Sequence, residues 1–194
     1  HSIRRRQRQM CIRDSKREDS YRIKVKLELP TSQGFGMSAA GLVAVARAFR
    51  TLSKKGTDEQ FLRLAHRVER MHGSGLGDVL GISAEGVELR LEPGAPGAGG
   101  KVVSFTTHQP LLLVWKPDES RHTSTYIDDE GWQRSISKAG ERSVSRLRLK
   151  EWNFERWADL MLESRNFAEA SGLLNEEVRK DLLSKVQKEI LRLD

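Results

Sequence analysis

The sequence predicts an α+β fold in which helices dominate the second half of the chain. Residues 21–29 and 86–91 alternate apolar and polar side chains, which is the pattern of half-buried strands. From about residue 128 onward, apolar residues recur at helical spacing instead. Strands and helices therefore mix along the chain, and we expect a mixed sheet with helices packed around it.

The individual elements follow in a readable order. After the strand at 21–29 comes a glycine-rich loop, and then a helix rich in Ala, Val and Leu at 41–52. Thr57 is a suitable N-cap for a second helix that runs to about Met71. Residues 101–105 predict a short strand, and the continuous apolar run at 110–115 predicts a central one. The remaining predicted helices cover residues 128–147, 151–165 and 176–192.

Composition excludes several classes of protein. Of the 194 residues, 37% are hydrophobic and 31% are charged, which is typical of a soluble globular chain. No stretch is long and apolar enough to span a membrane, so we expect no membrane partner. The single cysteine, Cys11, excludes a disulfide framework and a cysteine metal site, and a cytoplasmic, reducing location fits.

The net charge of +7 is concentrated at the N-terminus. Residues 1–17 hold seven basic residues and one acidic residue, which leaves about +1 for the rest of the chain. Residues 9–15 resemble a translated sequencing adapter, so we interpret residues 1–19 as a non-native or disordered basic tail. The alternative is a genuine basic arm of a nucleic-acid-binding protein, whose removal would abolish salt-dependent binding. Because the rest of the chain is nearly neutral, we expect no nucleic-acid partner.

The glycine loop at residues 30–41 has the order of an anion site. It follows a predicted strand and enters a predicted helix, so its backbone N–H groups and the positive helix end favour a bound anion. It holds no lysine, which excludes the Walker-type nucleotide loop. A phosphate would therefore be held by backbone groups and the Ser38 hydroxyl; the alternative is a glycine-rich helix entry with no ligand.

This loop resembles the phosphate loop of the GHMP kinases, a family that includes galactokinase, homoserine kinase and mevalonate kinase. The family pattern is Pro, three residues, Gly-Leu-Gly-Ser-Ser-Ala-Ala; here Phe35 replaces the leucine and Met37 the first serine. The resemblance implies that ATP is the cofactor, and that Mg²⁺ is held in part by Ser38. The implied ATP phosphate-binding residues are Gly34, Phe35, Gly36, Met37, Ser38 and Ala39.

A second stretch supplies the carboxylates that such a kinase needs. Glu69 lies late on the predicted helix, and Asp78 follows it in the segment Gly-Leu-Gly-Asp. By the resemblance, Glu69 binds the metal together with Ser38, and Asp78 activates or orients the acceptor hydroxyl. Phosphoryl transfer requires both roles, because Mg²⁺ neutralises the phosphate oxygens and a base handles the attacking alcohol. Taken singly, Glu69 could be a solvated helix acid and Asp78 a helix cap.

The residues of these motifs resemble one branch of the family in particular. Residues 33–41, 75–79 and 93–97 in succession are similar to the branch that phosphorylates the 4-hydroxyl of pantoate with ATP, on the archaeal route to coenzyme A. Pantoate carries a carboxylate, and Arg90 on the polar face of its strand is the first candidate to bind it. His66, one turn before Glu69, is the second. The alternatives are a surface arginine and a packed histidine.

The resemblance also implies an overall organisation. Residues 20–107 would be part of an N-terminal ATP-binding domain and residues 108–194 part of a C-terminal domain, in a two-domain GHMP-like fold with helices in each domain. The family's first motif and its third glycine-rich motif are not found, so we expect an incomplete and inactive chain. The expected partner is a small-molecule substrate, with a homodimer as the possible assembly. The alternative acceptors are homoserine-type and mevalonate-type alcohols.

Overall fold

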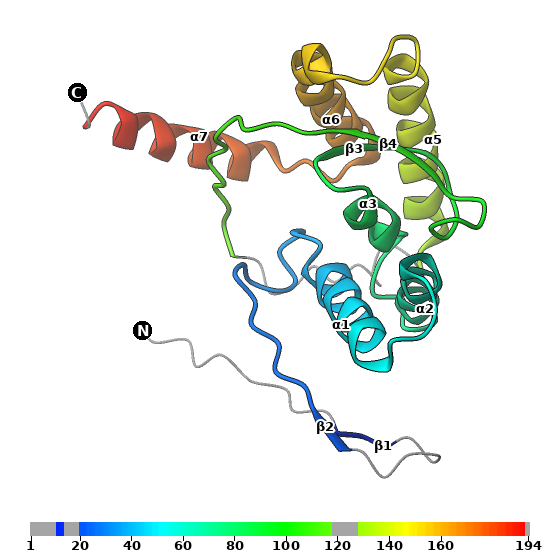
Figure 1. Ribbon diagram of the computed structural model, residues 1–194. Helices are drawn as coiled ribbons and strands as arrows, with labels where there is room; N and C mark the ends of the chain where they lie inside the picture. Colours follow the sequence, from blue (N-terminus) through cyan, green and yellow to red (C-terminus); the bar gives the residue numbers. More distant parts are fainter. Residues whose placement is uncertain (1–10, 14–19, 118–127, 193–194) are drawn as a thin grey trace.

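The computed structural model describes residues 11–13, 20–117 and 128–192 (Figure 1). Its helices are α1 (Met37–Ser53), α2 (Asp58–Met71), α3 (Asp78–Ala84), α5 (Glu130–Leu147), α6 (Trp157–Ser171) and α7 (Glu176–Ile190), with a 3₁₀ turn, η1 (Phe154–Arg156). Its strands are β1 (Cys11–Arg13), β2 (Ser20–Arg22), β3 (Val87–Glu92) and β4 (Lys101–Phe105). Helix and strand occur together, which confirms the α+β class.

Helices α1, α2 and α3 form the core that supports the glycine loop (Figure 1). The apolar stripes of α1 and α2 face each other, and α3 packs against both. The buried side chains of this cluster are Ala39, Val43, Ala46, Leu62, Ala65 and Val79. Small residues on α1 pack in this core, so the glycine loop before α1 and the segment after α2 are fixed with respect to each other.

Local signals set the ends of these helices. Thr57 caps α2 in a full capping box, in which its side chain accepts from the Gln60 N–H and the Gln60 side chain accepts from the Thr57 N–H. This confirms the predicted start of α2. Helix α1 begins earlier than predicted, at Met37, because Gly36 adopts the left-handed conformation (φ +65°) and turns the chain directly into the helix.

The described strands form two separate antiparallel pairs rather than the predicted mixed sheet. Strand β3 pairs with β4, and β1 pairs with β2. Strand β3 lies within one residue of the strand that the alternation predicted at 86–91, and β4 matches the short strand predicted at 101–105. The predicted strand at 21–29 is wrong beyond residue 22, because no neighbouring strand in the described residues supplies partners for its backbone.

The predicted central strand at 110–115 is also wrong. This segment is extended chain outside any sheet, and the side chains of Leu111 and Leu112 are 61% and 75% exposed. Trp115 makes an edge-to-face contact with Phe35 of the glycine loop, with ring centroids 5.3 Å apart. The apolar run therefore lies beside the glycine loop instead of inside a sheet.

Helices α5 and α6 form an antiparallel hairpin that packs against the β3–β4 pair (Figure 1). The indole of Trp152 donates to the Val87 carbonyl at 2.9 Å, and Phe105 of β4 contacts Trp152, Phe154 and Trp157. Helix α6 begins later than predicted, because Asn153 caps η1 first. The aromatic contacts attach the hairpin to the edge of the strand pair.

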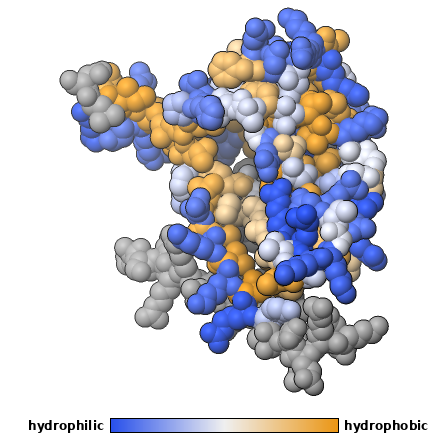
Figure 2. Space-filling model, viewed as in Figure 1, coloured by the Kyte–Doolittle hydropathy of each residue, from blue (hydrophilic) through white to orange (hydrophobic). Residues whose placement is uncertain are grey.

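Helix α7 extends away from the rest of the molecule and buries none of its residues (Figure 1). Apolar side chains are exposed along it, including Leu183 and Ile190 (Figure 2). None of the helices in the described ranges is long and apolar enough to cross a membrane. The domain boundary after residue 107 stays a prediction, as does the reading of residues 1–19, most of which lie outside the described residues.

Candidate active site

The glycine loop presents the N-terminal end of α1 to a large cleft. Gly36 is the N-cap, no side chain caps this end, and the first turn holds no acidic residue. The first-turn N–H groups therefore lack an internal acceptor, and the helix dipole places partial positive charge there. Ser38 lies in this first turn and is exposed. An anion would find backbone donors and a hydroxyl together at this point.

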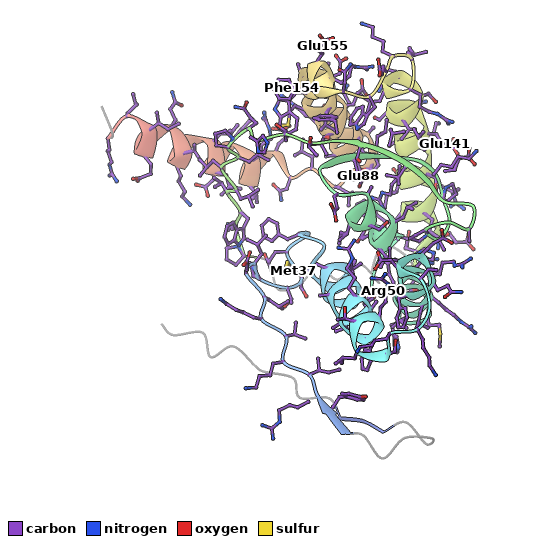
Figure 3. All side chains as sticks on the ribbon, viewed as in Figure 1. Met37, Arg50, Glu88, Glu141, Phe154 and Glu155 are labelled. Atoms are coloured by element: carbon purple, nitrogen blue, oxygen red, sulfur yellow. The ribbon has the colours of Figure 1, made fainter. Side chains whose placement is uncertain are left out.

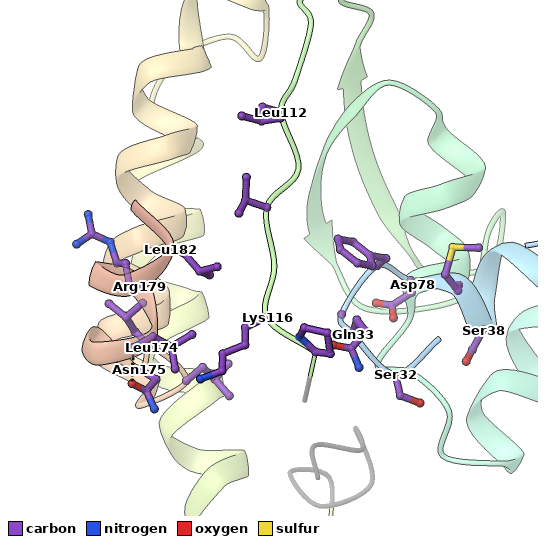
Figure 4. Close-up of a pocket in the computed structure, with 18 of the residues that line it drawn as sticks. Ser32, Gln33, Ser38, Asp78, Leu112, Lys116, Leu174, Asn175, Arg179 and Leu182 are labelled. Atoms are coloured by element: carbon purple, nitrogen blue, oxygen red, sulfur yellow. Dashed lines mark hydrogen bonds between the residues drawn. The ribbon is translucent and has the colours of Figure 1, made fainter. Parts of the chain in front are cut away.

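The cleft has a volume of about 1290 Å³ and separates the glycine loop from α7 (Figure 4). One wall consists of residues 32–38, residues 72–74 and Asp78; the other consists of residues 173–186 of α7 and the turn before it. The extended segment around Leu112 and Lys116 runs between the two walls. This volume is sufficient for a nucleotide-sized ligand.

Behind this wall, Glu69 holds the start of α3. Its side chain is only 1% exposed, and its Oε1 accepts from the N–H groups of Asp78 at 2.9 Å and Val79 at 3.4 Å. These are two of the N–H groups that the first turn of a helix leaves without a partner. A Cβ at Gly75 would collide with the same oxygen, so a larger residue in this bend would displace the Glu69 carboxylate from the start of α3.

The environment of Glu69 disfavours its charge. Burial raises the pKa of Glu69, and the nearby charge of Asp78 raises it further; the two backbone N–H groups and His66 act in the opposite direction. His66 Nδ1 lies 3.3 Å from Glu69 Oε2, yet neither atom has a well-aligned hydrogen-bond partner among the described residues. One oxygen of this buried carboxylate is thus bonded and the other is not.

Asp78 belongs to a small network of charges at the start of α3. Its Oδ1 lies 3.3 Å from Arg90 Nη1, and Arg90 Nε lies 3.4 Å from Glu88 Oε1. Burial raises the pKa of Glu88, Arg90 lowers it, and Asp78 raises it. Arg90 and Asp78 are each about 40% exposed on their side chains, so both are accessible to a ligand.

The structure brings the sequence-predicted residues together in two groups. Residues 34–38 and Asp78 line the cleft. Glu69, His66 and Arg90 gather around Asp78 but do not line the cleft. Ala39, predicted beside the phosphates, packs its side chain in the helical core at 2% exposure.

Sequence reasoning missed two features of this region. Glu88 joins the charge network, and the alternation of β3 already placed it on the same face as Arg90. The contribution of α7 to the far wall of the cleft had no local signal, because it depends on how distant segments pack.

The donor chemistry near the cleft fits Mg²⁺. The described residues contain no ready group of three or more His, Cys, Asp or Glu side chains around a single point. Magnesium sites in kinases usually need only one or two protein oxygens, because phosphates and waters complete the shell. Oε2 of Glu69 accepts no hydrogen bond from the described residues, although the side chain is only 1% exposed and does not line the cleft. A divalent cation that reached this oxygen would favour the charged form of the carboxylate, whose pKa burial and Asp78 raise.

Comparison with known proteins agrees with this geometry. Residues 5–86 match the GHMP kinases N terminal domain. This match confirms the resemblance to the GHMP kinases seen in the loop. No solved structure matches the chain.

The curated relatives that it matches are pantoate kinases. The chain is 36% identical over 151 residues to pantoate kinase of Thermococcus kodakarensis, which covers 78% of this chain and 48% of that protein. It is 31% identical over 152 residues to the Methanospirillum hungatei enzyme, covering 78% and 48%, and 29% identical over 160 residues to the Methanocaldococcus jannaschii enzyme, covering 82% and 56%. The chain spans about half the length of the curated relatives it matches.

Proposed function

We propose that this chain forms part of an ATP-dependent GHMP-type kinase that phosphorylates the 4-hydroxyl of pantoate. The observation that carries the proposal is the shared cleft, in which the uncapped N-terminal end of α1 and the carboxylate of Asp78 line the same wall. A phosphate donor site and a candidate base on one surface are the two requirements of phosphoryl transfer to an alcohol.

In this proposal residues 34–38 hold the ATP phosphates. The backbone N–H groups of the first turn of α1 donate to phosphate oxygens, and the Ser38 hydroxyl and Glu69 carboxylate hold Mg²⁺. When bound, Mg²⁺ neutralises charge on the phosphate oxygens. The loop positions the γ-phosphate, and the cleft wall excludes part of the surrounding water.

Asp78 takes the proton of the acceptor hydroxyl. As that oxygen forms its bond to the γ-phosphorus, the bond between this phosphorus and the bridging oxygen of ADP breaks, and the proton moves to Asp78. A well-placed general base contributes about 10²–10⁴ in rate. Glu69 assists indirectly, because its bonds to the N–H groups of Asp78 and Val79 fix where the Asp78 side chain starts.

The acceptor carboxylate is assigned to Arg90, with His66 beside it. The guanidinium has donors in a planar fork that suits a carboxylate, and it lies next to Asp78, so a hydroxy acid could meet both at once. The pantoate kinase relatives support this substrate over homoserine or mevalonate, which remain the alternatives to test.

The test combines ATP binding with turnover. Calorimetry with the chain itself measures Mg-ATP affinity, and ADP release by the complete gene product that contains it is compared with pantoate, homoserine and mevalonate. Asp78→Asn is expected to lower kcat by about 10²-fold or more while ATP affinity stays unchanged.

Asp58→Asn is the matched control, because it makes the same chemical change in the exposed first turn of α2. It should leave kcat unchanged. Activity of Asp78→Asn within a few-fold of the wild type would exclude the base role, and turnover of homoserine or mevalonate in place of pantoate would reassign the substrate.

A further inference from the structure

The carboxylate of Glu88 lies against helix α3. It lies on β3 two residues before Arg90, so both side chains project from the same face of the strand, and Figure 3 places Glu88 beside α3. A Cβ added to Gly81 of α3 would lie only 2.6 Å from Glu88 Oε1 and 2.9 Å from its Cδ. The carboxylate therefore lies directly against the backbone of α3, in space that only a glycine leaves open.

From this position Glu88 contacts one end of the Arg90 guanidinium. Arg90 Nε lies 3.4 Å from Glu88 Oε1, whereas Nη1 at the other end lies 3.3 Å from Asp78 Oδ1. Two ion-pair contacts on opposite edges restrict both the position and the plane of the guanidinium. A free arginine side chain would sample many rotamers, and each rotamer would point the donor fork in a different direction.

The Glu88–Arg90 pair is poorly explained by stability alone. Arg90 is 40% exposed, and ion pairs at such exposure stabilise folded proteins very little. Glu88 Oε2 is buried and accepts no hydrogen bond from the described residues, which is a cost to the fold. The geometric effect on Arg90 is the consequence that remains.

We propose that Glu88 is a positioning residue that orients the Arg90 guanidinium for the carboxylate of the substrate. The proposal rests on the assignment of Arg90 as the carboxylate-binding residue under the proposed function. In this role Glu88 acts through Arg90 and does not contact the substrate. The shared guanidinium also links Glu88 to Asp78, so the carboxylate-binding group and the candidate base are fixed by one side chain.

Two variants disturb Glu88 in different ways. Glu88→Gln removes its charge with little change in volume. Gly81→Ala retains every charge but forces the Glu88 carboxylate away from α3, and alanine also suits the helical backbone of α3 better than glycine does. Glu92→Gln is the control, because it removes an ion pair to Lys101 from the same strand without touching Arg90.

Two measurements separate a failure of this proposal from a failure of the proposed function, the first of them on the chain itself. The first is the Arg90 Nε–Hε cross-peak in a proton–nitrogen correlation spectrum, assigned by its loss in Arg90→Lys. In Glu88→Gln and Gly81→Ala this peak should shift and exchange faster with water, whereas Glu92→Gln should leave it unchanged. An unchanged peak in both variants would overturn the proposal, whatever the chain binds.

The second measurement is the titration of the complete gene product that contains the chain, wild type and each variant, with pantoate in the presence of Mg-ATP. Glu88→Gln and Gly81→Ala should each weaken pantoate binding by about tenfold, with Mg-ATP affinity unchanged. Wild-type affinity for pantoate in both variants would overturn the positioning role. If the wild type binds no pantoate, the proposed function fails, and the Arg90 cross-peak still decides whether Glu88 orients Arg90.

Discussion

Replacing Glu69 by alanine is expected to loosen the start of α3. The substitution removes the acceptor of the Asp78 N–H at 2.9 Å and of the Val79 N–H at 3.4 Å. Since the Glu69 side chain is only 1% exposed, water cannot readily replace the lost oxygen. Both N–H groups lie inside the first turn of α3, so they would lose their partner without gaining another.

The size of the effect follows from these two contacts. The shorter bond to a carboxylate is worth about 1.5–3 kcal/mol, and the longer one about 0.5 kcal/mol. Together they predict a free energy of unfolding about 2–3.5 kcal/mol lower in Glu69→Ala. For a chain of this size, about 3 kcal/mol corresponds to a Tm roughly 6–12 °C lower.

Urea unfolding followed by circular dichroism measures this difference directly. Glu69→Gln keeps an oxygen at the position of Oε1 and should unfold within about 1 kcal/mol of the wild type. Glu59→Ala in the first turn of the same helix removes an exposed ion pair to Arg63 and a favourable charge at the helix N-terminus but no buried hydrogen bond, so its effect should be below about 1 kcal/mol. Equal stability of the alanine and glutamine variants at position 69 would refute the capping role.

Two further predictions concern the scaffold. Thr57→Ala removes the hydroxyl that accepts from the Gln60 N–H in the capping box of α2 and should lower the free energy of unfolding by about 1 kcal/mol, measured by urea titration; no change would mean that this hydrogen bond contributes nothing. Hydrogen bonds from Arg146 hold the pKa of Glu163 below its usual value, so this carboxylate stabilises the fold above about pH 4.5, and that contribution is lost as the pH falls through the lowered pKa. Glu163→Gln should therefore show a smaller loss of Tm between about pH 5 and pH 3 than the wild type, and parallel curves would contradict this linkage.

Elements with local signals could be predicted from the sequence, and elements that depend on distant partners could not. The Thr57 cap and the alternation of β3 are local, and both elements occur where they were expected. The apolar run at 110–115 indicates residues that favour burial. Whether another strand pairs with them depends on distant segments, and no local sequence pattern predicts it. In the structure it lies beside the glycine loop, where the contact between Trp115 and Phe35 is between residues far apart in the chain.

The same distinction applies to the site. Spacing along the chain placed Glu69 before Asp78, and the structure brings the two side by side. The spacing could not show that the Glu69 carboxylate accepts hydrogen bonds from the backbone of α3, because this contact depends on the bend through Gly75. The association of Glu88 with Arg90 was within reach of the sequence, since strand alternation puts both residues on one face, but its close approach to Gly81 was not.

The two oxygens of Glu69 lead to a last prediction. Capping α3 needs only one acceptor, which a glutamine would supply, yet the residue is a buried carboxylate whose pKa is raised by burial and by Asp78. The charge is therefore a cost that capping does not explain, and Oε2, which lies 3.3 Å from His66 Nδ1, accepts no hydrogen bond from the described residues. If Glu69 helps to hold Mg²⁺, Glu69→Gln should keep the stability of the wild type but weaken ATP binding in Mg²⁺ by about tenfold, with no change in ATP binding in EDTA. Calorimetry in the two buffers makes this comparison, and equal weakening in both would assign the charge to the fold instead of the metal.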